Sequence, residues 1–150
     1  MIQSTNEAVE VKALHNPVTI SSTTATYGAW VDTRDYDSAA IVLNIGQIAG
    51  ESTLTATVYE KDSASGSGFA GDTGAIAVTG ASITATRASG QQSVKLGNIL
   101  TKNYKRYLAL RLSATTSNSA NPTIGAAAEI VLSSADKNPT DQTATFDVEG

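Results

Sequence analysis

Apolar and polar residues alternate along much of the chain, which predicts short β-strands with one buried face. The alternation is clearest at 104–114, where three leucines share one face and Tyr107, Ala109 and Arg111 share the other. A second alternating run covers 53–59. The run 39–45 is apolar at almost every position, which predicts a central strand covered on both sides.

Weaker versions of these patterns predict the remaining strands. They span residues 18–22, 24–31, 75–79, 82–86, 92–96 and 125–133. Gly80-Ala81 is read as a tight hairpin turn between two of them. Gly28 lies between Tyr27 and Trp30, where we expect a bulge or a close approach of backbone. Only residues 97–103 favour a short helix.

The spacing of strands and turn-forming residues predicts an all-β fold. We expect an antiparallel β-sandwich of jelly-roll or Greek-key type with about eight strands, and immunoglobulin-like connectivity stays open. The predicted organisation is an N-terminal arm at 1–16, a sandwich domain at 17–133 and a C-terminal tail at 134–150. Residues 1–13 contain a short alternating patch at 9–12 and are predicted to be either a short strand or an arm. The tail has few large apolar residues and is predicted to be an extended arm or disordered.

Composition narrows the functional classes. A chain of 150 residues suits one domain, and the absence of cysteine excludes thiolate zinc sites and a disulfide framework. A net charge of −4 disfavours a nucleic-acid partner. The first residues lack the basic and apolar regions of a signal peptide, and no apolar run approaches the roughly 20 residues that span a bilayer. We therefore expect a protein made in the cytoplasm, with no membrane partner.

No catalytic group stands out. The only histidine, His15, lies beside Asn16-Pro17 in an expected solvated turn, and no G-x-S-x-G motif is present. A catalytic triad needs a histidine held by packed elements near a nucleophile. The prediction is a protein that is not an enzyme, with no catalytic residues and no cofactor.

Three further motifs have alternative interpretations. One motif resembles a calcium loop through Asp32, Asp35 and Asp37, but it lacks the glycine and the bidentate glutamate of such a loop. Capping of the turn by the aspartates is therefore favoured. An intersubunit ion pair from Arg34 stays open as a third interpretation. The glycines at 66–74 lack the lysine of a phosphate-binding loop, so no metal or phosphate site is predicted.

The only basic cluster alternates with tyrosines, an arrangement that can stack on bases or sugars. Its members are Lys102, Lys105, Arg106, Arg111, Tyr104 and Tyr107. In an acidic protein we favour a solvated strand edge or a patch that docks on an acidic protein surface. Trp30 is interpreted as a core residue, with a sugar-stacking platform as the alternative.

Three segments together resemble small structural proteins of tailed bacteriophages, in particular capsid decoration (cement) proteins with a jelly-roll fold. They are W-x-D-T-R-D-Y-D-S-A-x-I-V-L-N-I-G at 30–46, L-T-A-T-V-Y-E-K-D-S-A-S-G-S-G-F at 54–69 and Y-K-R-Y-L-A-L-R-L-S-A at 104–114. A closing alanine-rich strand begins at Gly125. The resemblance covers about residues 30–133 and is a pattern of strands and turns.

The resemblance implies a homotrimer on the capsid exterior that clamps neighbouring subunits of the major capsid protein, with the terminal arms reaching over neighbours. Tail or fibre proteins of the virion are an alternative, as is a carbohydrate-binding module that recognises a host glycan through aromatic residues. Six residues are predicted to lie at an interface: Trp30, Arg34, Tyr36, Phe69, Tyr107 and Phe146.

Overall fold

The structure is a computed structural model that describes residues 8–49, 51–63, 74–87, 92–117 and 121–134. Most of these residues lie in strands. The strands are β1 (Ala8–Ile20), β2 (Thr26–Tyr27), β3 (Val31–Asp32), β4 (Ser38–Ile48), β5 (Ser52–Lys61), β6 (Ile76–Thr86), β7 (Gln92–Leu100), β8 (Tyr107–Thr116) and β9 (Ile124–Ser134). A 3₁₀ turn, η2, covers Thr101–Asn103.

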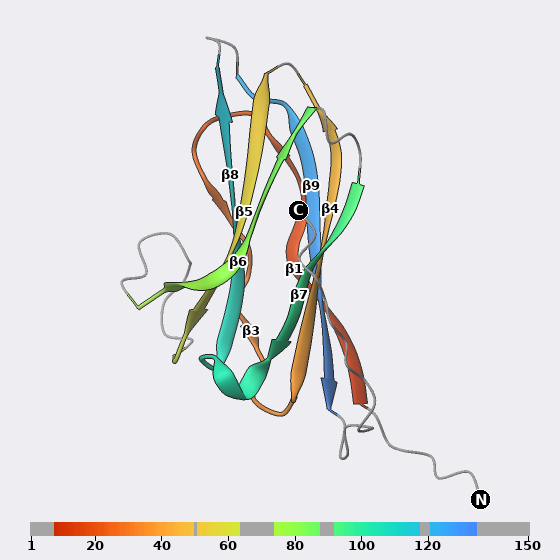
Figure 1. Ribbon diagram of the computed structural model, residues 1–150, viewed down its shortest axis with the longest axis vertical. Coiled ribbons are helices and arrows are strands. Elements are labelled where there is room, and N and C mark those ends of the chain that lie inside the picture. Colours follow the sequence, from red (N-terminus) through yellow and green to blue (C-terminus); the bar gives the residue numbers. More distant parts are fainter. Residues whose placement is uncertain (1–7, 50, 64–73, 88–91, 118–120, 135–150) are drawn as a thin grey trace, which may run out of the picture.

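The strands form two antiparallel sheets that pack face to face (Figure 1). One sheet has the order β1-β9-β4-β7, and the other has the order β2-β8-β5-β6, with β3 also pairing with β8. The short strands β2 and β3 act as one interrupted edge strand. With β2 and β3 counted as one strand, β1 pairs with β9, the interrupted strand pairs with β8, β4 pairs with β7, and β5 pairs with β6. This nesting of early strands with late ones is the topology of a jelly roll. The predicted fold class is confirmed.

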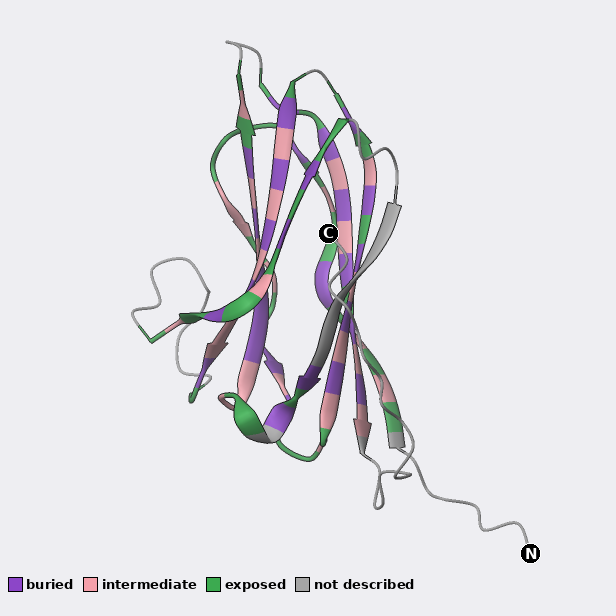
Figure 2. Ribbon diagram, viewed as in Figure 1, coloured by how far each residue is buried: buried purple, intermediate pink, exposed green. Residues whose placement is uncertain are grey.

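The core lies between the two sheets and is built almost entirely from aliphatic side chains. Buried and half-buried residues alternate along β4, β5 and β9 (Figure 2), as expected for strands with one face in the core. The largest fully buried side chains are Leu14, Ile20, Ile41, Leu43, Leu54, Leu108, Leu110, Leu112, Ile124, Ile130 and Leu132. The three leucines of β8 lie in this core, as the alternation predicted.

The segment between β2 and β3 ties the two sheets together at one edge. The Gly28 amide donates a 2.8 Å hydrogen bond to the Leu110 carbonyl of β8. The Ala29 amide donates a 3.1 Å hydrogen bond to the Leu14 carbonyl of β1. A Cβ atom on Gly28 would lie 2.0 Å from the Leu14 carbonyl oxygen. The predicted close approach of backbone at Gly28 is therefore confirmed.

Two predicted strand boundaries are wrong. The run 24–31 is not one strand, because the chain leaves β8 after Tyr27 to reach β1 and returns at Val31. The predicted hairpin at Gly80-Ala81 is a continuous β6, in which Gly80 has a φ of +79°. The pairing of β6 with β5 shifts register near this point, so Gly80 marks an irregularity within a strand.

The run 39–45 is central in its sheet, but it is not covered on both sides. Ala39, Ile41 and Leu43 are buried, whereas the intervening residues are half-buried or exposed. The expected helix at 97–103 is reduced to η2, because residues up to Leu100 belong to β7.

The first strand begins earlier than expected. Residues 8–16, assigned to the N-terminal arm from sequence, pair with β9 as part of β1. His15 is consequently buried within a strand and is not a solvated turn residue; its Nδ1 lies 2.9 Å from the Asn16 carbonyl oxygen. Residues 1–7 of the expected arm and 135–150 of the expected tail lie outside the described residues.

Candidate interaction surface

Aromatic and cationic side chains gather on the outer face of the sheet formed by β2, β3, β8 and β5. Residues that lie opposite each other on neighbouring strands point to the same face of a sheet. Tyr27 lies opposite Arg111, and both Asp32 and Lys61 lie opposite Tyr107. Tyr59 lies opposite Ala109, between these two rows.

We call this surface the aromatic face. It comprises Tyr27, Trp30, Tyr59, Lys61, Tyr107 and Arg111. Trp30 belongs to it because the Lys61 Nζ lies 4.3 Å from the centre of the indole ring. Lys61 is only 2% exposed, so this cation–π contact is shielded from water. Contacts of this kind contribute about 2 kcal/mol when they are desolvated.

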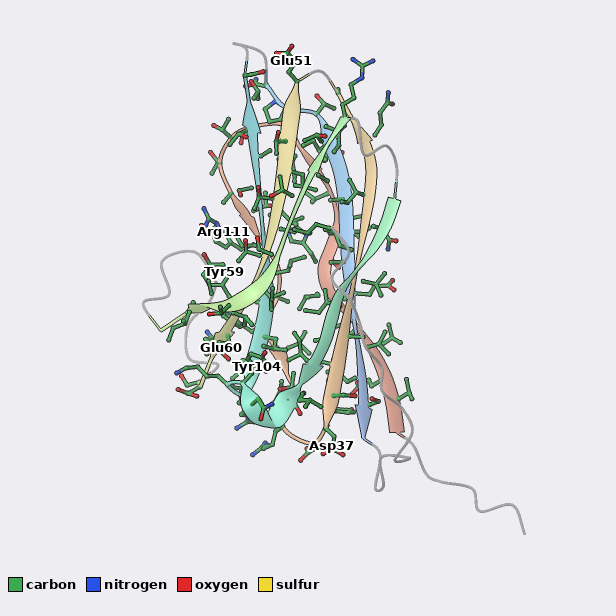
Figure 3. All side chains as sticks on the ribbon, in the orientation of Figure 1. Asp37, Glu51, Tyr59, Glu60, Tyr104 and Arg111 are labelled. Atoms are coloured by element: carbon green, nitrogen blue, oxygen red, sulfur yellow. The ribbon has the colours of Figure 1, made fainter. Side chains whose placement is uncertain are left out.

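Arg111 and Tyr59 form the centre of the aromatic face. The Arg111 guanidinium donates to the Tyr59 hydroxyl at 3.4 Å, and this contact is the main reason that the Arg111 pKa is raised. Figure 3 shows both side chains on the side of the sheet that faces away from β1, β4, β7 and β9. Ala109 also points outward, yet it is fully buried. The larger residues around it therefore form a packed layer.

A salt bridge closes one end of the aromatic face. Arg106 donates to both carboxylate oxygens of Asp32, at 2.9 and 2.5 Å, and the Arg34 amide donates to the same carboxylate at 3.0 Å. The hydrogen bonds from Arg106 are the largest cause of a lowered Asp32 pKa, which falls from 3.8 to about 2. The Arg106 guanidinium also lies 4.9 Å from the Tyr107 ring centre. The turn-capping interpretation of Asp32 is confirmed.

Two cations of the basic cluster pair with acidic residues within the molecule. Arg106 pairs with Asp32, and the Lys105 ammonium lies 2.5 Å from Asp62. The Lys105 amide also bonds Glu60 at 2.8 Å. These pairs leave fewer cations to meet either phosphates or an acidic protein surface, which favours the solvated strand edge among the interpretations of this cluster.

The six predicted interface residues separate into groups. Trp30 and Tyr107 are brought together on the aromatic face, and both are half-buried, so Trp30 is neither a core residue nor a fully exposed platform. Arg34 is exposed in the turn after β3. Tyr36 packs against the core, donates a hydrogen bond to Glu10 of β1 and has the Lys12 Nζ 6.0 Å from its ring centre. Phe69 and Phe146 lie outside the described residues.

Sequence reasoning missed Tyr27, Tyr59 and Lys61 as members of the aromatic face. A signal was present, since Tyr59 and Lys61 share one side of an alternating run, as do Tyr107 and Arg111. The sequence does not show that these two runs are neighbours. That follows only from the pairing of β5 with β8, in which Lys61 lies opposite Tyr107.

Within the described residues, no three or more His, Asp or Glu side chains are grouped closely enough to hold a metal ion. The same part of the chain contains no helix that is long and apolar enough to cross a membrane.

No protein-family model and no curated protein matches the chain. Solved structures do match its fold. The VP2 subviral particle of infectious bursal disease virus has a TM-score of 0.53 at 10% identity, and the match covers 87% of this chain and 33% of that one. The structure of the Gx strain of the same virus has a TM-score of 0.53 at 13% identity, and the match covers 89% and 33%.

A Bacillus endospore appendage, described as a disulfide-linked pilus, matches with a TM-score of 0.47 at 12% identity over 90% of this chain and 96% of that one. The present chain spans about a third of the length of the two viral chains. At these identities the likeness concerns the fold, a β-sandwich also found in assembled viral particles.

Proposed function

We propose that the protein is a non-enzymatic structural component of a virion that docks on the outer surface of a capsid through the aromatic face. The observation that carries this proposal is the packed layer of Trp30, three tyrosines and Arg111 on the outside of a jelly roll. The likeness of the fold to chains from viral particles and the resemblance to phage decoration proteins support the same proposal.

The chemistry of the aromatic face suits protein recognition. Trp, Tyr and Arg are the residues that most often dominate the energy of protein–protein interfaces. Their apolar bodies are already packed here, so little side-chain entropy is lost when a partner covers them. The polar tips of Tyr27, Tyr59 and Arg111 would then bond carbonyl or carboxylate groups of the partner. The proposed partner is the major capsid protein.

A cementing role needs many weak contacts and no chemistry. Copies arranged on a lattice bind with an avidity that exceeds the affinity of each contact. The proposed unit is a homotrimer on the capsid exterior. Mass measurement by light scattering tests the trimer: about three chain masses support it, and a single chain mass, also at high concentration, contradicts it.

Capsid binding is tested by co-sedimentation with purified capsids. Tyr27 and Tyr104 offer a matched pair, since they are 38% and 37% exposed but only Tyr27 lies on the aromatic face. We expect Tyr27→Ala to weaken binding about tenfold or more, in the range of an interface hot spot, and Tyr104→Ala to leave it unchanged. A wild-type chain that does not sediment with capsids, or equal losses in both variants, would contradict the proposal.

A second candidate function is binding of a host glycan. The observation that favours it is the gathering of Tyr27, Trp30, Tyr59 and Tyr107 on one face, because sugar rings stack on aromatic side chains whose other edge bears polar groups. A glycan array distinguishes the two functions. Binding that is lost in Tyr27→Ala and kept in Tyr104→Ala would support the glycan function, and an array without binding would count against it.

A further inference from the structure

Among the described residues, no strand pairs with the outer edge of β1 over its first half. β1 is the last strand of its sheet, and β9 is its only sheet neighbour among the described strands (Figure 1). Its second half is irregular, with register shifts on both sides of His15, a proline at position 17 and the Leu14 carbonyl bonded to Ala29. Its first half, 8–13, pairs with β9 without interruption. Only this half offers a regular row of backbone groups to another strand.

The open edge carries exposed apolar side chains. Val9 is 59% exposed and Val11 is 58% exposed. Val11 lies opposite Val131 of β9, which in turn lies opposite Ala40 of β4, so an apolar row crosses three strands on the outer face. Regular, apolar edge strands are ready templates for pairing, and natural proteins normally block them. Here Glu10 and Lys12 alternate with the valines, and edge charges of this kind block pairing with any strand that does not match them, so the partner must present opposite charges at these positions.

We propose that the partner is β1 of a second copy, paired antiparallel about a two-fold axis at Val11. In this register Val11 meets its own counterpart, and Val9 meets Ala13 of the other copy. The apolar rows of the two outer faces then join into one. The two four-stranded sheets become a single continuous sheet of eight strands. Such an interface is isologous, since the same patch serves both copies.

Charge complementarity selects this register. Glu10 and Lys12 lie 3.2 Å apart at the edge, and their side chains are 44% and 37% exposed. In the proposed pairing Glu10 of each copy faces Lys12 of the other, which forms two reciprocal ion pairs. A shift of two residues in either direction would place Glu10 opposite Glu10, or Lys12 opposite Lys12, and like charges directly opposite are destabilising.

The interface is short, so each pairing is weak in solution and gains strength when copies are held close together. It goes beyond docking on a capsid, because it links copies of this chain to one another through the sheet edge that lies apart from the aromatic face. Its failure would leave capsid binding by the aromatic face untouched.

A single introduced cysteine tests the register, since the chain has none of its own. Residues directly opposite in an antiparallel pair have Cα atoms about 4.5–5.5 Å apart, within the range that a disulfide spans. We therefore expect Val11→Cys to form a disulfide-linked dimer under mild oxidation. Val9→Cys is the matched control: the two copies of position 9 would lie about 13 Å apart, four residues along the strand, so it should stay monomeric.

Charge exchange provides an independent measurement. Glu10→Lys and Lys12→Glu should each reduce self-association in sedimentation velocity, and an equimolar mixture of the two variants should restore it, because each strand then faces its opposite charges. Equal crosslinking of both cysteine variants, or none in either, would overturn the proposal, as would a mixture that associates no better than its components. Protection, in dilute monomer, of the amides at 8–13 that do not face β9 would also overturn it, because the edge would then be covered within a single chain.

Discussion

The backbone contact at Gly28 provides the sharpest test of how the sandwich is closed. Replacing Gly28 by alanine would place a Cβ atom 2.0 Å from the Leu14 carbonyl oxygen, 3.0 Å from the Leu14 carbonyl carbon and 3.3 Å from the Leu110 carbonyl oxygen. All three atoms belong to strand backbones, so no side chain can turn aside. The linker must move by about 1 Å or more to reach an allowed separation.

This movement breaks the contacts that join the sheets. The bond from Gly28 to Leu110 is 2.8 Å long and the bond from Ala29 to Leu14 is 3.1 Å long, so neither survives a shift of that size with good geometry. Each buried group left without a partner costs about 1–3 kcal/mol. Alanine offsets about 0.4–1 kcal/mol by restricting the unfolded chain. For the two buried carbonyls, of Leu14 and Leu110, the expected loss of unfolding free energy is therefore about 1–5.5 kcal/mol.

Urea unfolding followed by circular dichroism measures this loss. With a slope of about 2 kcal/mol per molar urea, the midpoint of Gly28→Ala should fall by roughly 0.5–2.7 M. Gly125→Ala is the matched control, because a Cβ atom there would meet nothing within 4 Å. Its midpoint should stay within about 0.3 M of the wild type, in keeping with a surface substitution. A Gly28→Ala midpoint equal to that of Gly125→Ala would refute the role assigned to the linker.

Three other predictions concern the core, the salt bridge and the aromatic face. Leu110→Ala, in the fully buried centre of β8, should cost about 2–5 kcal/mol in urea unfolding, whereas Thr84→Ala at an exposed position of β6 should cost less than about 0.5 kcal/mol. The Asp32 pKa is lowered on folding, so its ion pair with Arg106 stabilises the fold above the unfolded pKa and loses this effect as pH falls from about 4 toward 2. The small difference in unfolding free energy between the wild type and Asp32→Asn should therefore shrink over that range. A constant difference would contradict the pairing. Trp30 is the only tryptophan, and its quenching by acrylamide should fall when capsids are added; unchanged quenching would exclude it from the contact.

The fold class was predictable because alternation in β5, β8 and β9 is a local property of the sequence. The first half of β1 alternates just as clearly, yet its direction could not be inferred. Val9 and Val11 point outward and Glu10 points inward, the reverse of the usual arrangement. The reversal is tolerated because Glu10 accepts a hydrogen bond from Tyr36 and lies beside Lys12 at the end of the sandwich.

Tertiary pairing explains most of what sequence reasoning missed. The apolar positions of 39–45 suggested burial on both faces, but Ala40 and Val42 lie on an outer face that no described element covers. The aromatic face depends on which strands are neighbours: Tyr27, Tyr59 and Arg111 come from three strands far apart in the chain. Gly80 has the composition of a turn, and only the pairing of β6 with β5 shows that it lies within a strand.

The pairing of the first strand with the last has a consequence for how the protein is made. β1 leaves the ribosome first, but β9, its partner, is synthesised more than a hundred residues later. Until then the backbone of β1 has no sheet to join, and closure of that sheet must wait for nearly the whole chain. Contacts so distant in sequence slow folding. During synthesis, β1 is therefore the strand that waits longest for its sheet partner.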